Sequence, residues 1–70
     1  MKVTIWDNGD GMALQFEYSQ KLNSIIRNVP PELRKWDYKK NIWIVDYDHY
    51  PYVEHVFADY GVTFRVLDLV

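Results

Sequence analysis

Seventy residues, 49% of them hydrophobic, with a formal net charge of −2, are enough for one small domain with one modest core. The hydrophobic fraction excludes a wholly disordered chain, and the lack of cysteine excludes disulfides and thiolate metal sites. No apolar run approaches the roughly 20 residues that span a bilayer, and the amino-terminal residues lack the apolar stretch of a signal peptide. We therefore expect a cytoplasmic protein without a membrane partner.

The first elements that the sequence predicts are two strands over residues 2–7 and 12–17. Val3 and Ile5 share one face of the first strand, which alternates apolar and polar positions. The intervening residues 8–11 are dense in Asn, Asp and Gly, which tolerate positive φ and are typical of a hairpin turn. The sequence therefore predicts a β-hairpin at the amino terminus.

An amphipathic helix is predicted after the hairpin. Ser19 is a suitable N-cap, and Pro30 with Pro31 ends the helix, because proline disfavours helical geometry in the residue before it. The apolar residues between them follow the i, i+3, i+4, i+7 spacing of one helical stripe. These residues are Leu22, Ile25, Ile26 and Val29.

Two further strands are predicted over residues 33–37 and 42–46, joined by a turn at 38–41. The second strand begins with four large apolar residues without polar interruption, which favours a central position buried on both faces. Trp43 lies within this run, so we expect its side chain to be buried.

The last predicted elements are a second helix and a final strand over residues 62–69. Asp48 is a candidate N-cap, Pro51 fits the first helical turn, and Gly61 suits the position after the helix end. The element order is β-β-α-β-β-α-β. This order predicts one α+β domain over residues 1–70, with a mixed, mostly antiparallel sheet and both helices on one face.

The sequence offers little for catalysis. It has no phosphate-binding glycine loop and no nucleophile-elbow pattern. His49 and His55 are six residues apart, which places them on different faces of a helix, and Asp46 and Asp48 fit capping and solvation at a helix start. We therefore expect a protein that is not an enzyme and that has no cofactor, no metal ion and no catalytic residues.

The most informative stretch runs from residue 30 to residue 45, where basic residues alternate with Trp and Tyr. Five of the eight basic residues lie between positions 27 and 40, opposed there only by Glu32 and Asp37. Cationic groups neutralise phosphates, while flat rings stack on unpaired bases. The alternative is a solvated hairpin with Trp36 and Trp43 as core residues.

Part of this stretch belongs to a spaced pattern that covers about residues 14–62. The pattern comprises Phe16-x-Tyr18, Leu22-x-x-Ile25-Ile26-Arg27, Val29-Pro30, Arg34-x-Trp36-Asp37-x-x-Lys40-x-x-Trp43, Asp46-Tyr47-Asp48 and Asp59-Tyr60-Gly61. It resembles the HARP domain that accompanies annealing helicases of the SNF2 class. It is also similar to the amino-terminal domains of other superfamily-two helicases, namely the UvsW type of phages and the damage-recognition domain of the XPB type.

The resemblance implies a module that binds single-stranded or branched DNA and directs a helicase motor to it. No motor and no ATPase motif is present in this chain. We therefore interpret it as a free-standing, phage-type accessory to helicase or recombination machinery, with a helicase as a further possible partner. An excised domain is the alternative, and the initiating Met1 favours a natural small protein. The oligomeric state is left open.

The expected DNA contacts follow from the basic and aromatic residues. Arg34, Lys35, Lys39 and Lys40 are expected to contact phosphates, Arg27 to extend the patch, and Trp36 or Tyr38 to stack on a base.

The alternative function is a small acidic module that binds a host or replication protein. From residue 46 onward the chain has five acidic residues and one basic residue, Arg65. Tyrosine is favoured at protein interfaces, and this half of the chain has four that could form such a face. They are Tyr47, Tyr50, Tyr52 and Tyr60.

Overall fold

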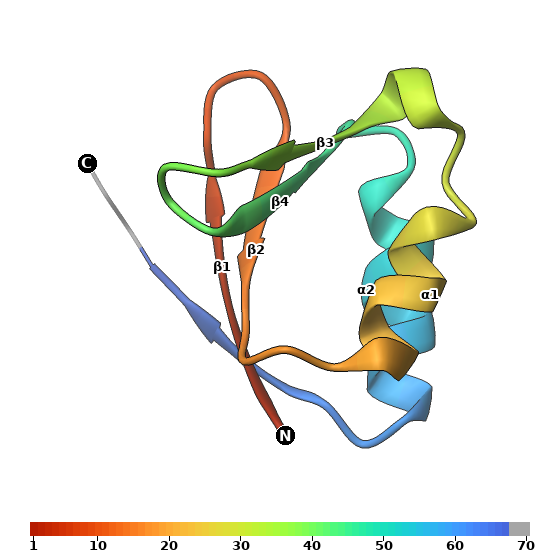
Figure 1. The fold of residues 1–70 in the computed structure, drawn as a ribbon. Coiled ribbons are helices and arrows are strands. Elements are labelled where there is room, and N and C mark those ends of the chain that lie inside the picture. The colour runs from red at the N-terminus through yellow and green to blue at the C-terminus, as the bar shows by residue number, and fades with distance from the viewer. Residues whose placement is uncertain (68–70) are drawn as a thin grey trace.

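The computed structural model describes residues 1–67, and within them the chain forms a mixed five-stranded sheet with two α-helices (Figure 1). The strands are β1 Lys2–Asp7, β2 Met12–Gln15, β3 Arg34–Asp37, β4 Ile42–Val45 and β5 Thr63–Val66; the helices are α1 Gln20–Arg27 and α2 Tyr50–Asp59. The strand order across the sheet is β3-β4-β2-β1-β5. Only β1 and β5 pair in parallel. The predicted α+β class and element order are confirmed.

The amino-terminal hairpin forms as predicted, although β2 ends at Gln15 rather than at residue 17. The backbone N–H of Asn8 donates to the carbonyl of Gly11 at 2.9 Å, and Gly9 adopts a φ of +89°. Gly11 is required for a different reason, because the backbone of β4 lies close to it. A Cβ at this position would lie 2.6 Å from the carbonyl oxygen of Val45, so a side chain would push β4 away.

The helix α1 begins as predicted, since the Ser19 hydroxyl accepts a hydrogen bond from the backbone N–H of Leu22 at 3.2 Å. It ends at Arg27, and Val29 is buried just beyond the helix. A short 3-10 helix then occupies Pro31–Leu33. For this reason β3 starts at residue 34, one residue later than predicted.

The start of α2 differs from the prediction, because Asp48 is not its N-cap. His49 occupies that position and makes no side-chain capping bond. Asp46 serves the turn before the helix: its backbone carbonyl accepts from the N–H of Tyr50 at 2.9 Å, and its carboxylate accepts from the N–H of Asp48 at 3.1 Å. At the other end, Gly61 follows the helix with a φ of +82°, as predicted.

Both helices pack on the same face of the sheet and enclose the main core with it (Figure 1). The helices contribute Leu22, Ile25 and Ile26 from α1 and Tyr50, Val53 and Phe57 from α2. Trp43 in β4 is buried in this core with 7% of its surface exposed, as predicted. The opposite face carries a smaller cluster of Ala13, Ile42 and Ile44, covered in part by Trp6.

The sheet has β3 at one edge and β5 at the other, whereas β4 lies between β3 and β2. The central position predicted for residues 42–46 is therefore confirmed, and all four residues of β4 are buried. The final strand begins one residue later than predicted, and residues 68 and 69 of the predicted range lie outside the described residues. Neither helix in the described part of the chain is long and apolar enough to cross a bilayer.

Candidate nucleic-acid interface

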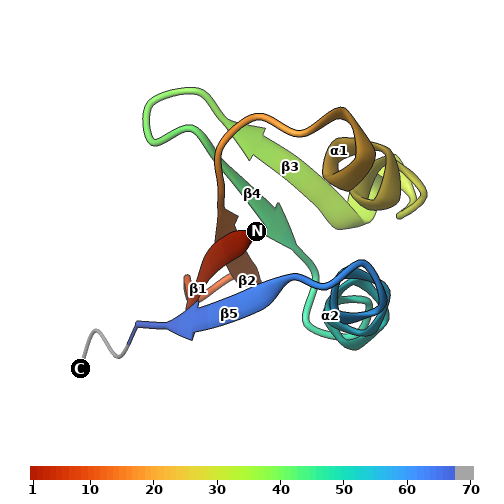
Figure 2. The ribbon, with the colours of Figure 1, turned by 90° about the horizontal axis from the view of Figure 1, so that it is seen from below.

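Two adjoining hollows of about 250 and 370 Å³ lie beside the β3–β4 hairpin and share four lining residues. The segment that joins β2 to α1 borders them, passing between the hairpin and the start of the helix (Figure 2). We call this feature the aromatic groove and define it by the residues that line the larger hollow. These are Tyr18, Asn23, Arg27, Trp36, Tyr38 and Trp43.

Strand register places the two tryptophans of the groove side by side. Trp36 in β3 pairs directly with Trp43 in β4, so both side chains point to the helix-bearing face. Their ring centroids are 5.2 Å apart and the rings meet edge to face at 63°. Because β3 is an edge strand, Trp36 has a strand neighbour on one side only, and 39% of its surface is exposed. The groove thus combines a buried ring at its base with a ring that solvent reaches.

Two tyrosines are the most exposed rings of the groove. Tyr18, in the connection before α1, has 80% of its surface exposed, and Tyr38, in the hairpin turn, has 84%. Exposed aromatic side chains beside a hollow offer flat faces on which planar ligands stack. Tyr38 was predicted as a site residue, whereas Tyr18 was not assigned to the site.

Asn23 holds the base of the groove. It lies in α1, and its side-chain oxygen Oδ1 accepts a hydrogen bond from the indole Nε1 of Trp43 at 3.0 Å. This bond satisfies the only polar atom of the buried tryptophan. Asn23 is not in the apolar stripe predicted for this helix and was not assigned to the site; the signal that could have found it is that a buried Trp43 requires an acceptor nearby.

The predicted phosphate contacts do not all lie at the groove. Arg34 is half-buried: its Nε donates to the carbonyl oxygen of Val29 at 2.9 Å, and its Cζ lies 6.0 Å from the centroid of the Trp43 ring. This arginine therefore ties β3 to the segment that follows α1 and lies over Trp43.

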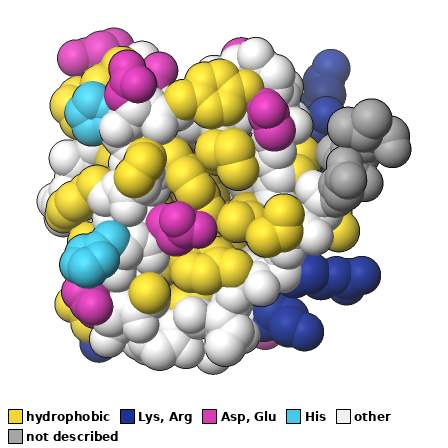
Figure 3. All heavy atoms as spheres, turned by 180° about the vertical axis from the view of Figure 1, so that it is seen from behind, with side chains coloured by type: hydrophobic (Ala, Val, Ile, Leu, Met, Phe, Trp, Pro, Cys, Tyr) yellow, Lys and Arg dark blue, Asp and Glu magenta, His cyan; other side chains and the backbone are white. Residues whose placement is uncertain are grey.

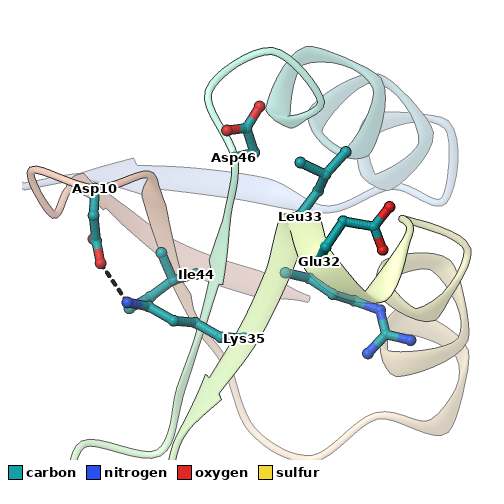
Figure 4. Close-up of a pocket in the computed structure, with 7 residues that line it drawn as sticks. Asp10, Glu32, Leu33, Lys35, Ile44 and Asp46 are labelled. Carbon is teal, nitrogen blue, oxygen red and sulfur yellow. Dashed lines mark hydrogen bonds and ion pairs between the residues drawn. The ribbon is translucent and has the colours of Figure 1, made fainter.

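Lys35 points to the opposite face of the sheet and forms an ion pair with Asp10 from the first hairpin turn (Figure 4). The two groups border a pocket of about 210 Å³ that also includes Glu32 and Asp46. The hydrogen bond from Lys35 holds the pKa of the Asp10 carboxyl below its usual value. Arg34 also lines this pocket, with its Nε already bonded to the carbonyl of Val29. We call this feature the acidic pocket; because its three carboxylates outnumber its two cations, it is poorly suited to phosphate.

The remaining basic residues flank the groove. Arg27, the last residue of α1, is exposed and lines the larger hollow. Lys39 and Lys40 occupy the exposed hairpin turn, where their backbone N–H groups donate to Oδ1 of Asp37 at 2.9 and 3.2 Å. Within residues 1–67, none of these three cations forms an ion pair. They are therefore available to an anionic ligand.

The tyrosines of the alternative protein-binding face are held in different surroundings. Tyr50 is buried in the core, and this burial raises its pKa. The hydroxyl of Tyr47 donates to Asp7 at the end of β1, whereas the exposed ring of Tyr60 has the Nζ of Lys21 at 4.6 Å from its centroid. Figure 3 shows hydrophobic and acidic side chains together on the side of α2 and β5, with Lys and Arg side chains at its margin.

The described residues do not bring together three or more His, Asp or Glu side chains in a cluster that could hold a metal ion. His49 lies 3.9 Å from Asp46 and His55 lies 3.6 Å from Asp59, each as an isolated pair. Comparison with models of protein families, with curated proteins and with solved structures gives no match to this chain.

Proposed function

We propose that this chain is a small, non-catalytic DNA-binding module that holds unpaired bases of single-stranded or branched DNA in the aromatic groove. The observation that carries the proposal is the gathering of Tyr18, Trp36 and Tyr38 around one hollow, with free cations beside them. Stacking of a base on an aromatic side chain contributes about 1–3 kcal/mol and tolerates any sequence, because every base has a π-face.

The positive charges beside the aromatic groove support the same ligand. Arg27 lies at the groove, and Lys39 and Lys40 adjoin Tyr38 in the hairpin turn. The hairpin and α1 lie on the opposite side of the molecule from α2 and β5 (Figure 2). At physiological salt the Debye length is about 8 Å, so acidic groups on that far side are largely screened from a bound strand.

The resemblance to HARP domains supports the proposal from a different direction. Of the residues that carry the resemblance, Phe16, Tyr18, Trp36 and Trp43 line the two hollows. Under this proposal the chain acts in the cytoplasm as a phage-type accessory that holds unpaired DNA for a helicase or for recombination machinery. The proposed base contacts are Tyr18, Trp36 and Tyr38. The proposed phosphate contacts are Arg27, Lys39 and Lys40. Arg34 and Lys35 are not among the proposed contacts.

The test is a fluorescence-anisotropy titration of labelled single-stranded, forked and duplex oligonucleotides at about 50 and 200 mM salt. The proposal predicts that the single-stranded and forked DNA bind more tightly than the duplex, because the bases of the duplex cannot reach the rings. It also predicts weaker binding at the higher salt concentration. No binding of any of the three at micromolar protein and the lower salt concentration would remove the DNA proposal and leave the protein-interaction module.

A further inference from the structure

The outer edge of β5 is a free edge of the sheet. β5 pairs with β1 alone, and the backbone N–H groups of Thr63 and Leu67 donate to carbonyl oxygens of the amino-terminal segment, each at 2.9 Å. Because alternate residues of a parallel strand bond to the same neighbour, the backbone groups of Phe64 and Val66 point away from β1. These groups have no strand partner within residues 1–67. They offer a template on which another extended segment can pair.

The helix-bearing side of this edge is apolar. Phe64 is paired in register with the core residue Val3, and its ring stacks on that of Phe57 in α2 with centroids 6.5 Å apart. Val66 is paired with Ile5 and points to the same face, yet 70% of its surface is exposed. A strand added beside β5 would cover the exposed parts of both side chains.

The two edges of the sheet differ in how they are protected. Three of the four residues of β3 are charged, and a short helix that begins at Pro31 precedes it. Charged residues and prolines discourage the pairing of an edge with another chain. β5 has one charged residue, Arg65, which points to the opposite face from Phe64. The β5 edge is therefore the better template.

The flank of α2 beside this edge is acidic. Tyr60 faces α1, because the Nζ of Lys21 lies 4.6 Å from its ring centroid. Successive helical residues are about 100° apart, so Glu54 lies about 120° from Tyr60, with Phe57 between them. Glu54 is therefore exposed on the flank away from α1, which is the flank toward β5 (Figure 2). Figure 3 shows acidic and hydrophobic side chains together over α2 and β5, and α2 contains no Lys or Arg.

We propose that the β5 edge binds an extended segment of a partner protein by strand addition, and that this segment carries apolar and basic residues on the side toward α2. Its backbone pairs with Phe64 and Val66, its apolar side chains cover them, and a basic side chain meets Glu54. A second copy of the chain fits less well, because each copy has the same acidic flank and a net charge of −2. The inference does not depend on DNA binding, since β5 and the hairpin of the aromatic groove lie at opposite ends of the strand order.

The probe is a synthetic peptide, TVTKTVT, blocked at both ends and titrated to millimolar concentration into the ¹⁵N-labelled chain. The amides of Phe64 and Val66 should shift and become protected from hydrogen exchange, whereas those of Thr63 and Arg65 should change less, because they already face β1. The peptide TVTETVT should bind about two- to fivefold more weakly, which is the range for one exposed ion pair. No binding of TVTKTVT, or shifts confined to the aromatic groove, would overturn the inference.

Val66→Pro tests strand addition directly. It removes an outward N–H without breaking a bond to β1, and proline is tolerated on an edge strand where its nitrogen faces solvent. This variant should lose the peptide, whereas the matched control Val66→Thr, which keeps the N–H, should retain it. Unchanged binding by Val66→Pro would overturn strand addition.

Glu54→Gln tests the charge preference and does not touch the strand. It should make the affinities for TVTKTVT and TVTETVT equal, and a preference that survives in this variant would overturn the role of Glu54. Sedimentation equilibrium distinguishes the other occupant. If the chain self-associates, Val66→Pro abolishes the association and neither peptide binds, the edge binds a second copy and the basic partner is overturned.

Discussion

The two faces of β3 carry opposite chemistry, although their residues are neighbours in the sequence. Arg34 and Trp36 point to the helix-bearing face and contact Trp43, whereas Lys35 points to the other face and pairs with Asp10. Consecutive side chains of a strand alternate between faces. A stretch with one basic and aromatic character is therefore divided into an aromatic groove and an acidic pocket.

The difference shows that the local charge of a sequence segment is a poor guide to the charge of a surface. In the acidic pocket, Asp10 and Asp46 come from other parts of the chain; Asp10 pairs with Lys35, and Asp46 lies at the other end of the pocket (Figure 4). In the aromatic groove, the free cations come from the end of α1 and from the hairpin turn.

The largest expected effect is on stability, from Trp43→Ala. Truncation of a buried large aromatic side chain costs about 3–5 kcal/mol, and it also leaves Asn23 without its partner. For a chain of 70 residues this loss is expected to unfold most molecules at room temperature, as measured by urea denaturation followed by circular dichroism. Trp36→Ala, on the exposed edge strand, should lower the unfolding free energy much less. Equal losses for the two variants would contradict the placement of the rings.

The next effect is on binding, from Trp36→Ala. If this ring stacks on an unpaired base, its removal should weaken the binding of single-stranded DNA by about 1–3 kcal/mol while the fold is retained. The reference is Lys35→Ala, which changes the other face of the same strand. An anisotropy titration in which Lys35→Ala is as damaging as Trp36→Ala would contradict the division between the two faces.

A smaller effect is expected on the salt dependence of binding. Each phosphate contact that is lost should reduce the slope of log K against log salt by about one unit. The joint change of Lys39→Ala and Lys40→Ala should therefore flatten the slope, because both side chains lie free in an exposed turn. Lys35→Ala should leave the slope unchanged. If Lys35→Ala changed the slope and the joint change of the turn lysines did not, the bound DNA strand would lie at the acidic pocket.

The smallest effect concerns acid stability. The hydrogen bond from Lys35 lowers the pKa of Asp10 below its ordinary value of 3.8. The ionised carboxylate therefore stabilises the fold at pH values above 3.8. This contribution is lost as the pH falls through the lower pKa of the folded state. Asp10→Asn should therefore make the unfolding free energy fall less steeply below pH 3.8, and Lys35→Ala should do the same. Profiles that match the wild type in both variants would show that this ion pair does not contribute.

Much of the fold could be predicted because its signals are local. The turn before β2, the Ser19 cap and the apolar stripe of α1 depend on residues within a few positions of each other. The candidate site was predicted only in part. The pairing of Lys35 with Asp10 and the bond of Trp43 to Asn23 join residues 25 and 20 positions apart, and these depend on strand order and on how α1 packs.

Mapping a bound single strand onto the chain shows whether the aromatic groove holds unpaired bases. A ¹H–¹⁵N titration of the labelled protein with oligo(dT) should shift the indole signal of Trp36, the side-chain amide of Asn23 and the backbone signals of Tyr18 and Tyr38. Signals of the acidic pocket, such as the amide of Glu32, should stay in place. Shifts confined to the acidic pocket or to α2, or no shifts at all, would show that the aromatic groove does not hold the strand.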